Sequence, residues 1–425
     1  MPMTGSKARG MNIIRGVATP FSQTNEHTVN RNPNFNMMDG IHTTRICTLM
    51  VTHACNLRCT YCFEKHKSND PSRRMDLGTA TAILSKEFNR FASFYRKGER
   101  FAVEFFGGEP LLNFTLIESV YDWVKRQVLD FPVVFQITTN GTLLTPHIRT
   151  WLTERKNDFR VILSVDGTEV MQARNRGCDI DAIPIAFVRD TWEKSYFKMT
   201  LSRETLPDFA AGVISLTEHG YRIASSPAEG IAWQPGDDLI YKEQLEQIGR
   251  YYLEHPEIVP EHPFNFLYKE MLDPEKTPVK SCGVGTSIVT YDIDGRSYPC
   301  HLFLPVVHGR EEHRKIAALD FSDPAKLVSE QCARCPLRHA CRTCYGYNYL
   351  DRGDIARRNP NNCRMQLAEA RVVSAFEINY LMQRSKRRQL TDDELLMLKA
   401  AVRCYRTVEK LKSEDLSPIS QLFNS

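Results

Sequence analysis

Cysteine is the residue type in this 425-residue chain whose spacing most clearly indicates chemistry. Three cysteines share the spacing C-x3-C-x2-C: Cys55, Cys59 and Cys62. A later cluster is flanked on both sides by further cysteines: Cys332, Cys335, Cys341 and Cys344, with Cys282, Cys300 and Cys363 around them. Because the chain shows no secretion signal, these groups predict metal or iron-sulfur ligation rather than disulfides. The other three are expected to be small buried apolar residues: Cys47, Cys178 and Cys404.

The spacing of the first three cysteines favours a particular kind of metal centre. Thiolates so close together can surround one cubane iron-sulfur cluster, but three of them hold only three of its four irons. One iron is therefore left open for another ligand. The alternatives are a structural zinc site or coincidence, and zinc sites usually need four ligands arranged in CxxC-like pairs.

The segments that must position these cysteines alternate between the hydrophobic pattern of a strand and that of a helix. Short β-type runs are expected at residues 45–52, 101–106, 133–139, 160–165, 197–201 and 222–225. Helical patterns separate them at residues 77–95, 117–128, 146–156, 182–193, 206–219 and 237–255. This alternation predicts an α/β fold with a parallel sheet and right-handed crossovers, either open and doubly wound or a partial (β/α)6 barrel.

Polar and glycine residues follow several of the predicted strands. These strand ends are Gly107-Gly108-Glu109-Pro110, Thr139-Asn140-Gly141, Ser164-Val165-Asp166-Gly167 and Ser202. Each alone is explained by turn formation. Both candidate architectures place their chemistry at the carboxyl ends of the strands, so the joint placement beside the first cysteines indicates a site.

Composition changes along the chain indicate four parts. Residues 1–44 are rich in Asn and predict an irregular segment, residues 45–260 the barrel, residues 275–365 a cysteine-rich domain, and residues 366–425 C-terminal helices. Thr391 and Glu394 form a capping box for the last helix. The basic run Arg384–Arg388 is expected at a solvated helix end.

The overall composition excludes several classes of protein. With 42% hydrophobic and 25% charged residues, it is typical of a globular protein. A net charge of +4 gives no reason to expect nucleic acid as the main partner. Neither a signal peptide nor a membrane-spanning apolar run is found, so a cytoplasmic protein without a membrane partner is expected.

The first cysteine motif resembles that of the radical S-adenosylmethionine (SAM) enzymes. In that family the open iron binds the amino and carboxylate groups of SAM, and the reduced cluster cleaves SAM to a 5'-deoxyadenosyl radical. The resemblance implies that Gly107, Gly108 and Glu109 form the segment beside the methionyl amino group. It also implies that Tyr61 lies near the adenine, and that Ser164 and Asp166 lie on the ribose and carboxylate side.

The later cysteines resemble the SPASM extension, which carries two auxiliary four-iron clusters. The resemblance implies that Cys282, Cys300 and Cys344 hold the first, and that the second is held by Cys332, Cys335, Cys341 and Cys363. Only two residues, Arg342 and Thr343, separate the last two clustered cysteines, where the family usually has three. Seven ligands also leave one auxiliary iron open or capped by another group. Zinc is the alternative here, although zinc ribbons separate their cysteine pairs by ~15 to 20 residues.

The resemblance implies an enzyme that abstracts hydrogen from a ribosomally made precursor peptide and installs a thioether or carbon-carbon crosslink. Such an enzyme needs an external electron donor and, since no leader-binding module is evident here, a separate leader-recognition protein or another surface. A second hypothesis is a sulfatase-maturating enzyme that forms formylglycine with Glu229 or Asp292 as general base. A third is an electron carrier or zinc-binding interaction protein. No catalytic acid or base is otherwise assigned.

Overall fold

The computed structural model describes residues 43–413 except 69, 71, 266–267, 274–279 and 281. The predicted irregular segment therefore lies almost wholly outside the described residues. The strands are β1 (Thr43–Thr52), β2 (Arg100–Gly107), β3 (Val133–Thr139), β4 (Phe159–Ser164), β5 (Phe197–Leu201), β6 (Ile223–Pro227), β7 (Ile288–Tyr291) and β8 (Ser297–Tyr298).

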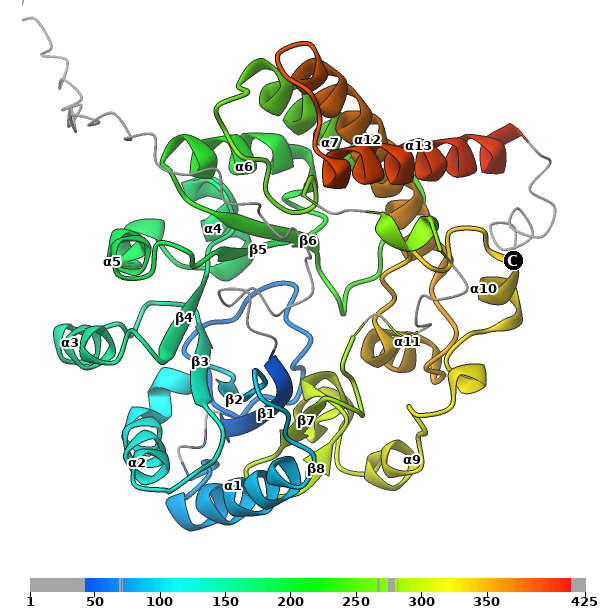
Figure 1. Ribbon diagram of the computed structural model, residues 1–425. Coiled ribbons are helices and arrows are strands. Elements are labelled where there is room, and N and C mark those ends of the chain that lie inside the picture. Colours follow the sequence, from blue (N-terminus) through cyan, green and yellow to red (C-terminus); the bar gives the residue numbers. More distant parts are fainter. Residues whose placement is uncertain are drawn as a thin grey trace, which may run out of the picture. The chain divides into compact units, whose positions relative to one another are not determined.

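Helices separate the strands and follow them (Figure 1). The first seven are α1 (Leu77–Ala92), α2 (Phe114–Lys125), α3 (Pro146–Glu154), α4 (Glu169–Arg176), α5 (Ile185–Thr191), α6 (Phe209–Glu218) and α7 (Asp237–Glu254). The later ones are α8 (Pro305–His308), α9 (His313–Ala317), α10 (Glu330–Arg334), α11 (Tyr345–Arg352), α12 (Pro360–Ser385) and α13 (Asp392–Ser413). None of the helices in the described residues is long and apolar enough to cross a membrane.

The sheet confirms the predicted parallel α/β architecture. Its strand order is β6-β5-β4-β3-β2-β1-β7-β8, and every pairing from β6 to β7 is parallel. Only β8 runs antiparallel, beside β7. Among the described residues, β6 forms one edge and is not paired with β1, so the sheet is a partial barrel that does not close.

The two faces of the strands differ in chemistry. Leu49, Val103 and Ile137 belong to the apolar core that also contains residues of α1, α2 and α3, helices that line one side of the strands (Figure 1). Successive strand residues point to opposite faces, and the alternate positions hold polar residues together with apolar ones such as Ala102 and Val134. Thr48 and Gln136 on the neighbouring strands both donate to the Glu104 carboxylate, at 2.6 and 2.8 Å. The face away from the helices therefore combines a polar cluster at Glu104 with apolar residues.

One helix close to the site, α4, is missing from the sequence prediction. Its sequence, EVMQARNR, carries a single buried apolar residue, Met171, and so shows no hydrophobic stripe. Capping explains why it forms: the Thr168 hydroxyl accepts from the Met171 amide, and Gly177 ends the helix with a left-handed φ of 66°.

The cysteine-rich region is joined to the barrel through the same sheet. Strand β7 pairs with β1, and Tyr241 of α7 donates to Glu369 of α12 at 2.7 Å. The boundary expected at residue 365 falls inside α12. At the start of α13, the predicted capping box is present, because the Thr391 amide donates to Glu394 and the Glu394 amide donates to the Thr391 hydroxyl. Arg388, from the basic run, forms an ion pair with Glu394.

Candidate functional site

The first three cysteines lie on the loop that follows β1 at the polar end of the sheet. Cys55 is buried, whereas Cys59 and Cys62 are half-buried. The loop is fixed by the Cys62 amide, which donates to the Cys59 carbonyl at 3.2 Å, and by the Thr60 amide, which donates to the Asn175 carbonyl of α4 at 2.8 Å. Burial raises the pKa of Cys55, and it raises that of Cys59 to about 11. Metal binding to these thiols must therefore displace protons.

Lys67 is a charged neighbour of this loop that the sequence analysis did not identify. Its positive charge lowers the pKa of Cys55 against the effect of burial. Burial lowers the pKa of Lys67 itself, but Cys62, Cys55 and Glu64 outweigh it and raise that pKa. Lys67 therefore favours the thiolate forms that bind metals.

Close backbone packing explains why glycine occupies the end of β2 and the next position. The sequence analysis did not give this reason. A Cβ atom on Gly108 would lie 2.4 Å from the Ala54 carbonyl oxygen and 2.8 Å from the Cys55 Cβ. A Cβ on Gly107 would lie 2.7 Å from the Thr52 carbonyl oxygen. The backbone of β2 thus passes directly against the start of the cysteine loop. Approach of these glycines to a cofactor remains a prediction.

Alanine at Gly108 is expected to displace the Cys55 loop, because backbone atoms stand where the new methyl group must go. We expect anaerobically reconstituted Gly108→Ala protein to lose about four irons per chain and to unfold ~1–3 kcal/mol more easily in urea. Gly78→Ala is the matched control, since its Cβ would meet only the end of the Asp76 side chain at 3.2 Å. Full iron content in Gly108→Ala would contradict this account.

Glu109 is buried and holds the ends of β2 and β3 together. Its carboxylate accepts from the Thr139 hydroxyl at 2.7 Å, the Asn140 amide at 2.8 Å and the Leu111 amide at 3.1 Å. Burial raises its pKa, and these hydrogen bonds oppose that effect. Its contacts in the described residues therefore hold the backbone at the ends of β2 and β3 in place.

Asp166 is fully buried, and protein donors surround its carboxylate. It accepts from the Tyr61 hydroxyl at 2.6 Å, from Arg176 Nε and Nη2 at 2.9 and 3.0 Å, from Asn175 Nδ2 at 3.2 Å and from the Thr200 amide at 2.9 Å. Burial raises the pKa of Tyr61, and Asp166 raises it further, so the phenol stays protonated and donates. Asp166 therefore connects Tyr61 of the cysteine loop to α4 and β5.

The structure brings the later cysteines together in two groups. Cys300 and Cys282 both raise the pKa of Cys344, after burial as the main cause. In the second group, burial raises the pKa of Cys363 to about 12, with further contributions from Cys341, Cys332 and Cys335. These are the two sets that the SPASM resemblance implies. Their role as ligands remains a prediction.

These groups do not have the geometry of single-ion sites. Across the described residues, no three His, Cys, Asp or Glu side chains are arranged to hold one metal ion. A zinc site would bring every ligand within ~2.0–2.3 Å of one ion. A cubane distributes its thiolates over separate irons and accommodates wider groups.

Two charged residues lie on or just after the neighbouring strands β5 and β6. Lys198 of β5 is paired in register with Ser164, which is buried. Glu229, just after β6, has a buried Oε2 atom without a hydrogen-bond partner. Burial raises its pKa to about 7, although Arg358 and Lys198 oppose this. Gly230 lies against Phe63, the residue after Cys62.

His301 directly follows Cys300 in the sequence. It stacks on Phe106 with ring centroids 4.8 Å apart. Burial lowers its pKa to about 4, and Lys198 contributes, so the imidazole is neutral at physiological pH. The carboxylate that the sequence analysis considered as an alternative base, Asp292, is paired with His53 at 2.5 Å and is buried.

Three cysteines outside the grouped ones were expected to be buried apolar residues, and two of them are. Cys47 and Cys404 are fully buried. Cys178 is half-buried and accepts from Gln172 Nε2 at 3.3 Å, so it is not a simple core residue.

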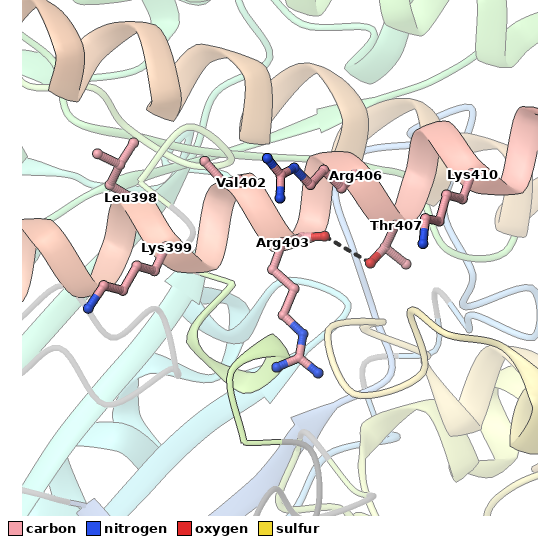
Figure 2. Close-up of a pocket in the computed structure, with 7 residues that line it drawn as sticks. All are labelled: Leu398, Lys399, Val402, Arg403, Arg406, Thr407 and Lys410. Carbon is pink, nitrogen blue, oxygen red and sulfur yellow. Dashed lines mark hydrogen bonds between the residues drawn. The ribbon is translucent and has the colours of Figure 1, made fainter.

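A hollow of about 510 Å³ lies along α13, apart from the predicted site residues (Figure 2). It is lined by Leu398, Lys399, Val402, Arg403, Arg406, Thr407 and Lys410. The Thr407 hydroxyl donates to the Arg403 carbonyl at 2.8 Å within the helix. Its lining is basic and contains no cysteine.

Comparison with known proteins assigns the class. Residues 49–182 match the Radical SAM superfamily. Uncharacterized protein MJ0907 of Methanocaldococcus jannaschii is 34% identical over 134 residues, which is 32% of this chain and 42% of that protein. The radical SAM cyclopropyl synthase TigE of Paramaledivibacter caminithermalis is 28% identical over 185 residues, 40% of this chain and 38% of TigE. The aligned regions thus span about two fifths of these relatives.

A sulfatase-maturating enzyme and an AdoMet-bound solved structure are also similar. The cysteine-type anaerobic sulfatase-maturating enzyme of Clostridium novyi is 30% identical over 128 residues, 29% of this chain and 32% of that enzyme. The structure of anSMEcpe with bound AdoMet has a TM-score of 0.58 at 17% identity and covers 84% of this chain and 98% of its own. This likeness shows that the two chains share a fold.

Residues 49–182 of the chain thus carry a radical SAM domain, and the fold as a whole is shared with a solved AdoMet-bound structure. The chain's relatives include a radical SAM cyclopropyl synthase and a sulfatase-maturating enzyme. The resemblance seen in the cysteine motifs is therefore confirmed for the class. The family implies a four-iron cluster and SAM as cofactors.

Proposed function

We propose that this protein is a radical SAM enzyme that modifies a peptide and holds three four-iron clusters on its ten grouped cysteines. The observation that carries the proposal is that cysteines far apart in the sequence influence one another electrostatically in the fold. Cys341, Cys332 and Cys335 act electrostatically on Cys363, and Cys300 and Cys282 act electrostatically on Cys344. Cys55, Cys59 and Cys62 would hold the remaining cluster.

The chain's own residues prepare the space in which the reaction takes place. When bound, a reduced cluster with SAM supplies a 5'-deoxyadenosyl radical, chemistry that side chains cannot provide. Glu109 and Asp166 hold the strand ends and the Tyr61 loop in place. Lys198 and Glu229 offer charged groups, and we place the residue to be modified beside these two side chains. The apolar helix-facing side of the sheet keeps this arrangement rigid.

The substrate in this proposal is a precursor peptide, and the product carries a crosslink. The relationship to TigE, a radical SAM cyclopropyl synthase, supports a reaction on carbon-hydrogen bonds. An external electron donor reduces the clusters. Leader recognition would come from a separate protein or from another surface of this chain.

The proposal is tested anaerobically with the purified full-length chain. After reconstitution with iron and sulfide, we expect about twelve irons per chain, the content of three cubanes. With SAM and dithionite, 5'-deoxyadenosine should form. Synthetic peptides encoded by short reading frames beside the gene are then added, and mass spectrometry should show loss of hydrogen from one of them. A colourless, zinc-loaded protein that leaves SAM intact would favour the electron-carrier or zinc-binding alternative and overturn the proposal.

Formylglycine formation on a sulfatase is the second candidate function. The Clostridium novyi relative supports it. Two bases were considered for this reaction. The Asp292 carboxylate is hydrogen-bonded to His53, whereas Glu229 Oε2 has no hydrogen-bond partner. Glu229 is therefore the better candidate. Incubation with a cysteine-containing sulfatase peptide distinguishes the two functions, because formylglycine yields a hydrazine-reactive aldehyde and a crosslink does not.

Glu229→Gln is expected to stabilise the apo-protein at alkaline pH. The pKa of Glu229 is raised to about 7 in the folded state, so the folded chain binds the proton more tightly than the unfolded chain. Stability from this group is present below pH 4.5 and is lost as the pH rises toward 7. We expect the variant to exceed wild type by roughly 1–3 kcal/mol at pH 8 but not at pH 4.5. Urea unfolding at both pH values measures this difference.

The exposed Glu193 provides the matched control for this charge removal. Glu193→Gln should leave the free energy of unfolding unchanged at both pH values, because an exposed carboxyl group is hydrated in both states. Equal stability of Glu229→Gln and wild type at pH 8 would show that the Glu229 carboxylate is not held in an unfavourable environment.

A further inference from the structure

Arg358 makes a direct contact with one of the predicted ligand sulfurs. Its Nη1 atom donates to Cys341 Sγ at 2.6 Å. Arg358 is half-buried in the segment between α11 and α12. That segment is held at its end by Asn359, which donates to Asp351 at 3.0 Å and caps α12 by accepting from the Asn361 amide at 2.9 Å. The guanidinium is therefore presented to the thiol by a fixed backbone.

The positive charge of Arg358 interacts favourably with the thiolate forms of Cys341 and Cys363. Burial alone lowers the pKa of Arg358, but Cys341, Cys363 and Glu229 outweigh that effect and raise it. In return, Arg358 opposes the burial that raises the pKa of Cys341 and of Cys363. The structure thus places a permanent positive charge beside sulfur atoms that must carry negative charge when they bind metal.

We propose that Arg358 raises the reduction potential of the cluster held by Cys332, Cys335, Cys341 and Cys363, an inference that rests on the proposed function. Hydrogen bonds to ligand sulfurs and nearby charge are known means by which proteins set iron-sulfur potentials. One-electron reduction adds negative charge to the cluster and its thiolates. A guanidinium hydrogen bond to Cys341 stabilises that added charge, so the reduced form is favoured.

Arg358 also acts electrostatically on Glu229. Arg358 is the leading charged influence on the pKa of Glu229, and Lys198 is the next. Glu229 in turn is the leading charged influence on the pKa of Cys344, in the other auxiliary group. Arg358 is thus a positioning residue, which acts through the sulfur atoms and not on the substrate.

The test is a potentiometric titration of the full chain, followed by electron paramagnetic resonance. Cys55, Cys59 and Cys62 are replaced by alanine in every sample, so that only auxiliary clusters contribute signals. Three changes are compared in this background: Arg358→Gln, Arg358→Lys and Arg357→Gln. Arg357 is the matched control, because it is the adjacent residue, carries the same charge and is exposed. Iron per chain is measured for each sample.

We expect Arg358→Gln to shift one auxiliary signal to a more negative potential. Arg358→Lys, which keeps the charge but loses the planar donor fork, should shift it less. Arg357→Gln should leave it in place. If Arg358→Gln fails to retain iron, Arg358→Lys alone decides the outcome, and an unshifted potential in that variant overturns the inference.

Two results would overturn the inference in distinguishable ways. Equal potentials in Arg358→Gln and its parent, or equal shifts in Arg358→Gln and Arg357→Gln, would show that the contact with Cys341 does not set the potential, and the proposed function would stand. Absence of auxiliary iron from the parent protein would show that the cluster assignment itself is wrong, before any arginine variant is measured.

Discussion

Alanine at any one of Cys55, Cys59 or Cys62 is expected to abolish formation of 5'-deoxyadenosine from SAM. Three thiolates hold three irons of a cubane and leave the last iron for SAM. The loop carries no fourth cysteine that could replace a lost ligand. We expect rates below the detection limit, together with a loss of about four of the twelve irons. Product analysis by liquid chromatography and iron determination on the same sample provide both measurements.

Two further variants show whether such a loss is specific. Cys404→Ala removes a fully buried thiol of α13 and should retain both the iron and the SAM cleavage of wild type. Cys363→Ala should lose auxiliary iron but still produce 5'-deoxyadenosine, because the first cysteine group is intact. Wild-type cleavage of SAM by Cys55→Ala would refute the assignment of that loop. Equal losses in Cys363→Ala and Cys55→Ala would show that the cysteine groups do not act separately.

The sequence predicts the sheet well, because strand and helix periods alternate strongly. Residues 133–139 and 197–201 are strands with the same bounds as expected. Helix α4 was missed because its face toward the barrel is polar and carries Gln172 and Asn175 in place of an apolar stripe. The caps at Thr168 and Gly177 are the signal from which it could have been predicted.

The sequence is less informative about side chains that act through long-range contacts. The grouped cysteines are visible as spacings, but Arg176, Lys198 and Arg358 are single charged residues with no local pattern. Their partners lie on other elements, such as Asp166 for Arg176 and Cys341 for Arg358. For Asp166 the resemblance implied a contact with the cofactor. That contact stays a prediction. The structure shows that protein donors surround the Asp166 carboxylate, and these contacts give its substitution a second expected effect.

Asp166→Asn is expected to destabilise the protein and to detach the cysteine loop. The variant leaves the buried Arg176 guanidinium without its counter-charge, an arrangement that costs roughly 3–5 kcal/mol. It also weakens the bond that holds Tyr61. We expect a lower midpoint in urea and loss of iron from the first cysteine group. Because this variant can fail to fold, Tyr61→Phe gives the sharper test.

Tyr61→Phe removes only the hydroxyl group that donates to Asp166 at 2.6 Å and retains the ring. The lost bond involves a charged acceptor and is worth about 1.5–3 kcal/mol. If Asp166 holds the loop through Tyr61, this variant should lose iron during gel filtration faster than wild type, while Tyr196→Phe, which changes a tyrosine outside the loop, should not. If Asp166 instead contacts the cofactor, Tyr61→Phe should keep its iron, and Asp166→Asn should weaken SAM binding without changing iron retention. Iron release and SAM affinity, measured on the same preparations, therefore separate the role that the structure shows from the role that the family resemblance implies.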